Sequence, residues 1–191
     1  WRFLRTKYGY SDDQIAPYTF NLAPFLADPK AVQQGYVTSE PFEIERAGIK
    51  PVVMLLSDSG YTSYASLIVV SRNMADDKHD LVQRFVDATT IGWYNYMYGD
   101  NKKANELIKK ANPDMDDEQI AFSIAKMKEY GIVDSGDSLT LGMGAMTDAR
   151  MKSFFDKMVK AGVVRGDIDY RKAYTLQFVN KKVGLDLRPR N

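Results

Sequence analysis

Apolar residues occur in short blocks separated by turn residues over residues 1–70. Residues 51–56 are a short continuous apolar run, a pattern typical of a buried strand. Residues 65–70 predict a second buried strand, and residues 36–39 a third, shorter one. Helices are predicted over residues 1–9 and from Glu40 to Gly48, the second with Pro41 in its first turn. This alternation predicts an α/β fold.

After Ser71 the apolar residues recur every three or four positions, which is the period of an amphipathic helix. The longest such stretch covers residues 82–97, and further helices are predicted over 102–110, 116–131 and 147–162. Thr147 suits the N-cap of the last helix, and Gly162 suits its end. Most methionines lie on the apolar faces of these helices, which favours packing over a soft-metal site.

Composition and charge exclude several classes of function. The chain has 191 residues, of which 45% are hydrophobic, so it can fill the core of one large or two small domains. Its 26 Lys and Arg nearly balance 25 Asp and Glu, which argues against nucleic acid as a partner. Without cysteine, and with His79 as the single histidine, no thiol chemistry, histidine-rich metal site or separate catalytic histidine is available. We therefore expect no metal, no cofactor and no catalytic residue.

The hydropathy of the chain and its first residues bear on membrane insertion and on targeting. No apolar run reaches the length of about 18 residues that a bilayer span needs, so we expect no membrane span. The chain begins with Trp1 inside a predicted helix, and no charged start with an apolar leader precedes it. We therefore expect a cut chain from which a signal sequence has been removed.

Polar and aromatic residues gather where the predicted strands and loops end. In an open α/β sheet, ligands bind at the carboxyl ends of the strands. The candidate ligand-binding residues on this basis are Asn21, Phe25, Ser39, Glu40, Asp58, Tyr61 and Tyr64. The same residues also suit purely structural roles. Asn21 and Ser39 can be turn or cap residues, Glu40 can be an acid in the first turn of a helix, and the two tyrosines can pack over the core.

Three segments of the chain together resemble the solute-binding proteins of ABC importers. They are Tyr-Thr-Phe-Asn-Leu-Ala-Pro-Phe at 18–25, Gln-Gln-Gly-Tyr-Val-Thr-Ser-Glu-Pro-Phe at 33–42, and His-Asp-Leu-Val-Gln-Arg-Phe at 79–85. The group that they resemble binds nitrate, sulfonates, taurine and thiamin pyrimidine precursors. The order and spacing of these segments extend the resemblance over essentially the whole chain.

The resemblance implies a type II periplasmic-binding fold, in which two α/β lobes are joined by a hinge and hold a ligand between them. Residues 1–64 would form most of the second lobe, and residues 65–191 the crossover and the return to the first lobe. The N-terminal half-lobe of such proteins would be missing from this chain.

The resemblance further implies a periplasmic receptor that delivers a small polar solute to importer permease subunits, with a pyrimidine-like thiamin precursor favoured. Glu40 would accept hydrogen bonds, Tyr61 or Phe25 would pack on the solute, and Asn21 and Ser39 would complete the lining. A nitrate, sulfonate or taurine receptor is the first alternative, although a carboxylate repels anions. A pyrimidine-synthase-like enzyme is disfavoured because residues 60–64 lack its cysteines, and an interaction domain without a small ligand stays open.

Overall fold

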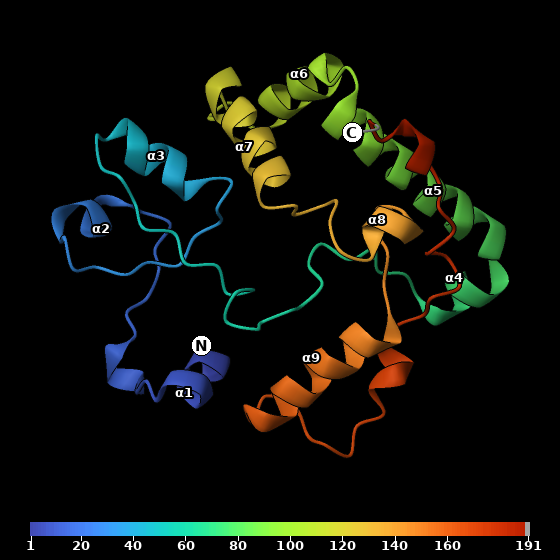
Figure 1. The fold of residues 1–191 in the computed structure, drawn as a ribbon, viewed down its shortest axis with the longest axis horizontal. Coiled ribbons are helices and arrows are strands. Elements are labelled where there is room, and N and C mark those ends of the chain that lie inside the picture. The colour runs from blue at the N-terminus through green and yellow to red at the C-terminus, as the bar shows by residue number, and fades with distance from the viewer. Residues whose placement is uncertain (190–191) are drawn as a thin grey trace.

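The computed structural model describes residues 1–189, and helices form all the regular structure in that range (Figure 1). The α-helices are α1 Arg2–Tyr8, α2 Ala23–Ala27, α3 Glu40–Arg46, α4 Arg72–Asp77, α5 His79–Tyr98, α6 Lys102–Ala111, α7 Asp117–Glu129, α8 Ser138–Leu141 and α9 Asp148–Lys160. Short 3-10 helices are η1 Asp12–Gln14, η2 Tyr170–Ala173 and η3 Leu185–Leu187. The predicted α/β architecture, a type II periplasmic-binding fold, is therefore wrong for this structure.

The predicted strands fail because nothing in the described chain pairs with them. Residues 51–56 and 65–70 form no regular structure, and most of their side chains are open to solvent: Val52 is 86% exposed, Met54 71% and Val69 84%. The backbone N–H and C=O groups of a strand need hydrogen-bond partners on a neighbouring strand. The third run, residues 36–39, closes into a turn in which the Ser39 N–H donates to the Tyr36 carbonyl at 2.9 Å. The division of the chain near residue 64 stays a prediction.

The helices predicted after Ser71 are confirmed, together with several of their caps. Asp116 accepts the backbone N–H of Gln119 at 2.7 Å, which caps α7. Thr147 accepts the N–H of Arg150 at 3.3 Å at the start of α9. None of the helices within residues 1–189 combines the length and the apolar character that a bilayer crossing requires.

The long helix α5 organises the core of the C-terminal half. Tyr94 is fully buried and packs with Met97 and Met143, and its hydroxyl accepts the Met143 N–H at 3.1 Å. The last segment of the chain returns along α5, where Gly184 adopts a φ of 68°. A Cβ at this glycine would lie 2.8 Å from Cδ2 of Tyr94, so this close approach requires glycine. Figure 1 shows the returning segment beside α5.

A buried carboxylate ties the same segment to the loop before α8. The Asp134 side chain is 4% exposed, and Arg188 binds both of its oxygens, with Nε of Arg188 2.8 Å from Oδ2. Tyr98 and Ser138 donate to the same carboxylate at 2.7 and 3.0 Å. Burial favours the neutral acid, but these hydrogen bonds outweigh it and lower the pKa of Asp134. Burial and the bond to Asp134 raise the pKa of Tyr98 to about 12.

Candidate functional site

Glu40 begins α3, and its half-buried carboxylate folds back over the preceding turn. Oε2 accepts the backbone N–H of Tyr36 at 2.6 Å, and Oε1 accepts the hydroxyl of Tyr18 at 3.1 Å. Gly35 permits this arrangement, because a Cβ there would lie 3.0 Å from Cδ of Glu40. Burial, followed by the bond to Glu40, raises the pKa of Tyr18. A carboxylate has about four acceptor positions, so this one can still receive donors from a ligand.

Phe20 presents an aromatic ring next to Tyr18, the residue whose hydroxyl binds this carboxylate. Its side chain is 89% exposed, and its ring centroid lies 4.9 Å from that of Tyr18, the residue that binds Glu40. Its φ of 57° lies in the left-handed region, which costs a residue with a Cβ roughly 1–2 kcal/mol. An exposed aromatic side chain on strained backbone is a common feature of binding sites. We call Tyr18, Phe20, Tyr36 and Glu40 the Glu40 site.

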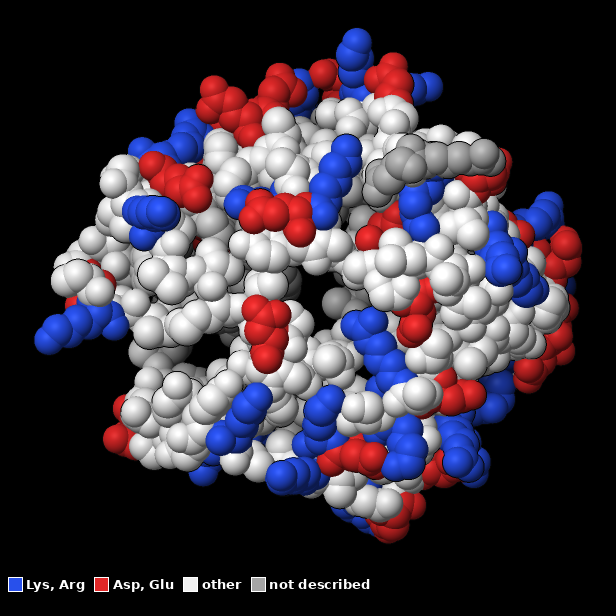
Figure 2. All heavy atoms as spheres, viewed as in Figure 1, with Lys and Arg blue, Asp and Glu red and all other residues white. Residues whose placement is uncertain are grey.

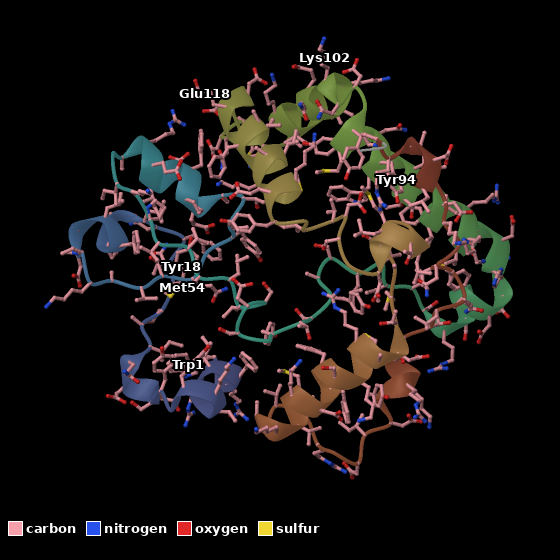
Figure 3. All side chains as sticks on the ribbon, in the orientation of Figure 1. Trp1, Tyr18, Met54, Tyr94, Lys102 and Glu118 are labelled. Atoms are coloured by element: carbon pink, nitrogen blue, oxygen red, sulfur yellow. The ribbon has the colours of Figure 1, made fainter. Side chains whose placement is uncertain are left out.

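Sequence reasoning selected Glu40 but missed the aromatic members of its site. The signal available was the aromatic content of residues 18–20, directly before the candidate Asn21. The left-handed backbone of Phe20 has no counterpart in the sequence, because that conformation is usual for glycine and not for phenylalanine. In Figure 3, Tyr18 lies near α2 and α3, on the side of the molecule away from Tyr94.

Four other predicted residues lie on or near α2, α3 and the turn that follows them. Asn21 is exposed, and its Oδ1 accepts the backbone N–H of Ala23 at 2.9 Å, which starts α2. Phe25 is half-buried within α2. Ser39 is the N-cap of α3 without a capping hydrogen bond from its side chain, and Asp58 is exposed on a turn. The side chain of Asn21 is thus used in a hydrogen bond within the fold, whereas Ser39 makes no capping hydrogen bond and Asp58 is exposed to solvent.

Tyr61 links α1 to α9. Its ring packs edge-on against Phe3 of α1, with centroids 5.2 Å apart, and against Phe154 of α9 at the same distance. Both contacts are near-perpendicular, with interplanar angles of 63° and 88°. Because its ring already contacts two aromatic neighbours, Tyr61 is less suited to stacking on a solute than Phe20 is.

Tyr64 anchors the extended segment to the start of α9. Its hydroxyl accepts the Thr147 N–H at 2.9 Å, and the Arg150 guanidinium lies over its ring, 4.2 Å from the centroid. Arg150 also donates to the carbonyls of Thr62 and Ser63, both at 3.1 Å. The structure therefore separates the predicted residues: Tyr61 and Tyr64 contact α9, away from Glu40, and Asp58 lies on a turn whose next residue, Ser59, is bound by Lys7 and Tyr8 of α1. Figure 2, in the orientation of Figure 1, shows that the molecule is hollowed near its centre.

Comparison with known proteins gives one decisive match. Residues 3–104, more than half of the chain, match the family described as NMT1/THI5 like. The chain belongs to the NMT1/THI5-like family. No curated protein and no solved structure matches it. The predicted resemblance is thus confirmed at the level of the family over residues 3–104, whereas the importer role and the extension of the resemblance to residues 105–191 stay predictions.

All the predicted binding residues lie within the NMT1/THI5-like range, and so does the whole Glu40 site. Within residues 1–189, no three side chains of the kinds that ligate metals come together to hold an ion. The chemistry that this site offers is one carboxylate acceptor and one exposed ring, linked through Tyr18. Such a pair suits a planar molecule that carries N–H donors.

Proposed function

We propose that this NMT1/THI5-like chain is the solute-binding component of an ABC importer. It captures a small, planar, polar solute, with a pyrimidine-like thiamin precursor favoured, and it acts without chemical turnover. The observation that carries the proposal is the half-buried Glu40 carboxylate, bound by the hydroxyl of Tyr18, whose ring packs with the exposed ring of Phe20. A periplasmic location and the importer permease as partner belong to the same proposal.

The carboxylate of Glu40 and the ring of Phe20 would make different contacts with a solute. An ionised carboxylate accepts N–H donors in charge-assisted hydrogen bonds, which are roughly twice as strong as neutral ones. Phe20 supplies the apolar face on which a heterocycle can stack. The groups that bind the Glu40 carboxylate are a hydroxyl and a backbone amide, neither of which is a cation. This charge pattern favours a donor-rich solute over nitrate, a sulfonate or taurine.

The first prediction concerns the charge of Glu40. Glu40→Gln keeps an oxygen for the Tyr36 N–H but loses the negative charge, so we expect affinity for an aminopyrimidine to fall about tenfold. Isothermal titration calorimetry measures this change. Glu43→Gln is the matched control, because Glu43 lies on the same helix and is exposed. Equal affinities for the two variants would remove the role proposed for Glu40, and taurine binding that improves in Glu40→Gln would favour the anion alternative.

The second prediction separates binding from stability at Phe20. Phe20→Gly relieves the left-handed strain and removes little buried surface, so we expect the free energy of unfolding to stay level or rise by about 1 kcal/mol. Affinity for the aminopyrimidine should fall in the same variant, because the stacking ring is lost. Urea denaturation and calorimetry measure the two effects. Phe20→Ala loses the ring and keeps the strain, so it should weaken binding without gaining stability; unchanged affinity in both variants would contradict the assignment.

A further inference from the structure

An open hollow of about 730 Å³ lies between the first turns of α9 and the segment that carries η2. This volume is typical of sites for small molecules. The hollow is outside the NMT1/THI5-like range and contains none of the residues of the Glu40 site. Its lining combines aromatic, cationic and acidic side chains, chiefly Asp148, Lys152, Tyr170, Arg171 and Tyr174.

The aromatic wall of the hollow is held in place from both sides. Tyr170 stacks on Phe155 of α9, with ring centroids 4.7 Å apart and planes 23° apart. The ring of Tyr174 is nearly parallel to that of Tyr170, at 15°. The Tyr174 hydroxyl donates to the Asp148 carboxylate, and this bond, followed by burial, raises the pKa of Tyr174 to about 12. Tyr174 is therefore a neutral phenol fixed against the first turn of α9.

The hollow is lined by two cations, Lys152 and Arg171, and by one acidic side chain, Asp148, whose carboxylate accepts the Tyr174 hydroxyl. Lys152 pairs with Asp156 at 2.6 Å, a bond that is the main cause of its raised pKa, and the nearby charge of Arg171 opposes this rise in pKa. Arg171 lies 5.9 Å from the Tyr170 ring centroid and belongs to no ion pair within residues 1–189. In Figure 2, Lys and Arg side chains over the lower part of the molecule stand among Asp and Glu side chains.

We propose that this hollow is a second binding site, which takes a small aromatic carboxylate. The planar fork of a guanidinium matches a carboxylate in two parallel hydrogen bonds, so Arg171 would hold the acid group. The ring of the ligand would lie against the tyrosine wall. A neutral ligand would lack this charge-assisted pairing with Arg171.

The test uses benzoate as the probe and the 191-residue chain. We expect benzoate to bind, with chemical-shift changes in the amides of Ala149 and Tyr174, and to bind more tightly than acetate or the neutral benzamide. Arg171→Ala should weaken benzoate binding about tenfold. Arg165→Ala is the control, because Arg165 is an exposed arginine that pairs with Asp167 away from the hollow, and it should leave binding unchanged.

Three outcomes would overturn this site. They are benzamide binding as tightly as benzoate, equal benzoate affinity in Arg171→Ala and Arg165→Ala, and loss of benzoate binding in Glu40→Gln but not in Arg171→Ala. The last outcome would place the aromatic acid at the Glu40 site, so failure of the second site can be told apart from failure of the proposed solute function. Arg171 is exposed, and its replacement leaves the buried core intact, which a circular dichroism melt checks.

Discussion

Replacement of Arg188 by alanine is expected to lower the free energy of unfolding by about 3 kcal/mol or more, because it strands a buried charge. The Asp134 side chain is 4% exposed and receives two donors from Arg188. The same guanidinium donates to the carbonyls of Ser138 and Leu139, at 3.0 and 2.9 Å. Its loss therefore leaves a carboxylate and two carbonyl groups short of donors. Urea denaturation followed by circular dichroism measures the change.

Two comparisons sharpen this expectation. Arg165→Ala removes an exposed pair with side chains 80% and 63% exposed, and such pairs contribute about 0–1 kcal/mol. Asp134→Asn combined with Arg188→Met removes both charges, so the double variant should be less destabilised than Arg188→Ala alone. If Arg188→Ala is no worse than Arg165→Ala, then the buried pair does not stabilise the fold.

The pH dependence of stability gives an independent reading of the same pair. The pKa of Asp134 is lowered in the folded chain, so its contribution is complete above the ordinary carboxyl pKa of about 3.9 and is lost as the pH falls through the lower, folded value. We expect the wild-type chain to lose stability in that acid range. Arg188→Ala should lose less on acidification, because its remaining carboxylate has lost the donors that lowered the pKa.

The sequence predicted the helices well because their signals are local. Spacing of three to four residues along α5, a threonine cap before α9 and acidic residues at the start of α7 all act within a few positions. Strands depend on partners that sequence periodicity cannot supply. Val52 and Val69 belong to segments with the composition of buried strands. Both are nevertheless more than four-fifths exposed in the described chain, which offers no strand to pair with those segments.

The candidate site was predictable to the same limited extent. The carboxylate of Glu40 could be expected at the start of α3, because the glutamate and the proline after it form a local helix-start signal. Its contacts to Tyr18 and to the Tyr36 amide depend on how the 18–40 segment folds back on itself. The hollow beside α9 combines residues 148–152 with residues 170–176, and no short motif in the sequence marks that juxtaposition.

The other large effect is expected at Tyr94, where alanine should lower the free energy of unfolding by about 3–5 kcal/mol. The ring is fully buried, packs with Met97 and Met143, and lies against the position where Gly184 brings the returning chain close. Its removal opens a cavity that the left-handed turn at Gly184 cannot fill without breaking its own hydrogen bonds, such as Leu187 N–H to the Gly184 carbonyl at 3.0 Å. Thermal and urea denaturation measure the loss.

Tyr94→Phe divides this effect into its two physical parts. It keeps the ring and removes the hydroxyl that accepts the Met143 N–H at 3.1 Å, so it should cost about 1–3 kcal/mol for a buried amide left without a partner. The difference between the phenylalanine and alanine variants then reports the cavity alone. A phenylalanine variant as unstable as the alanine variant would mean that the hydrogen bond to Met143, and not the packing of the ring against Gly184, holds the last segment on α5.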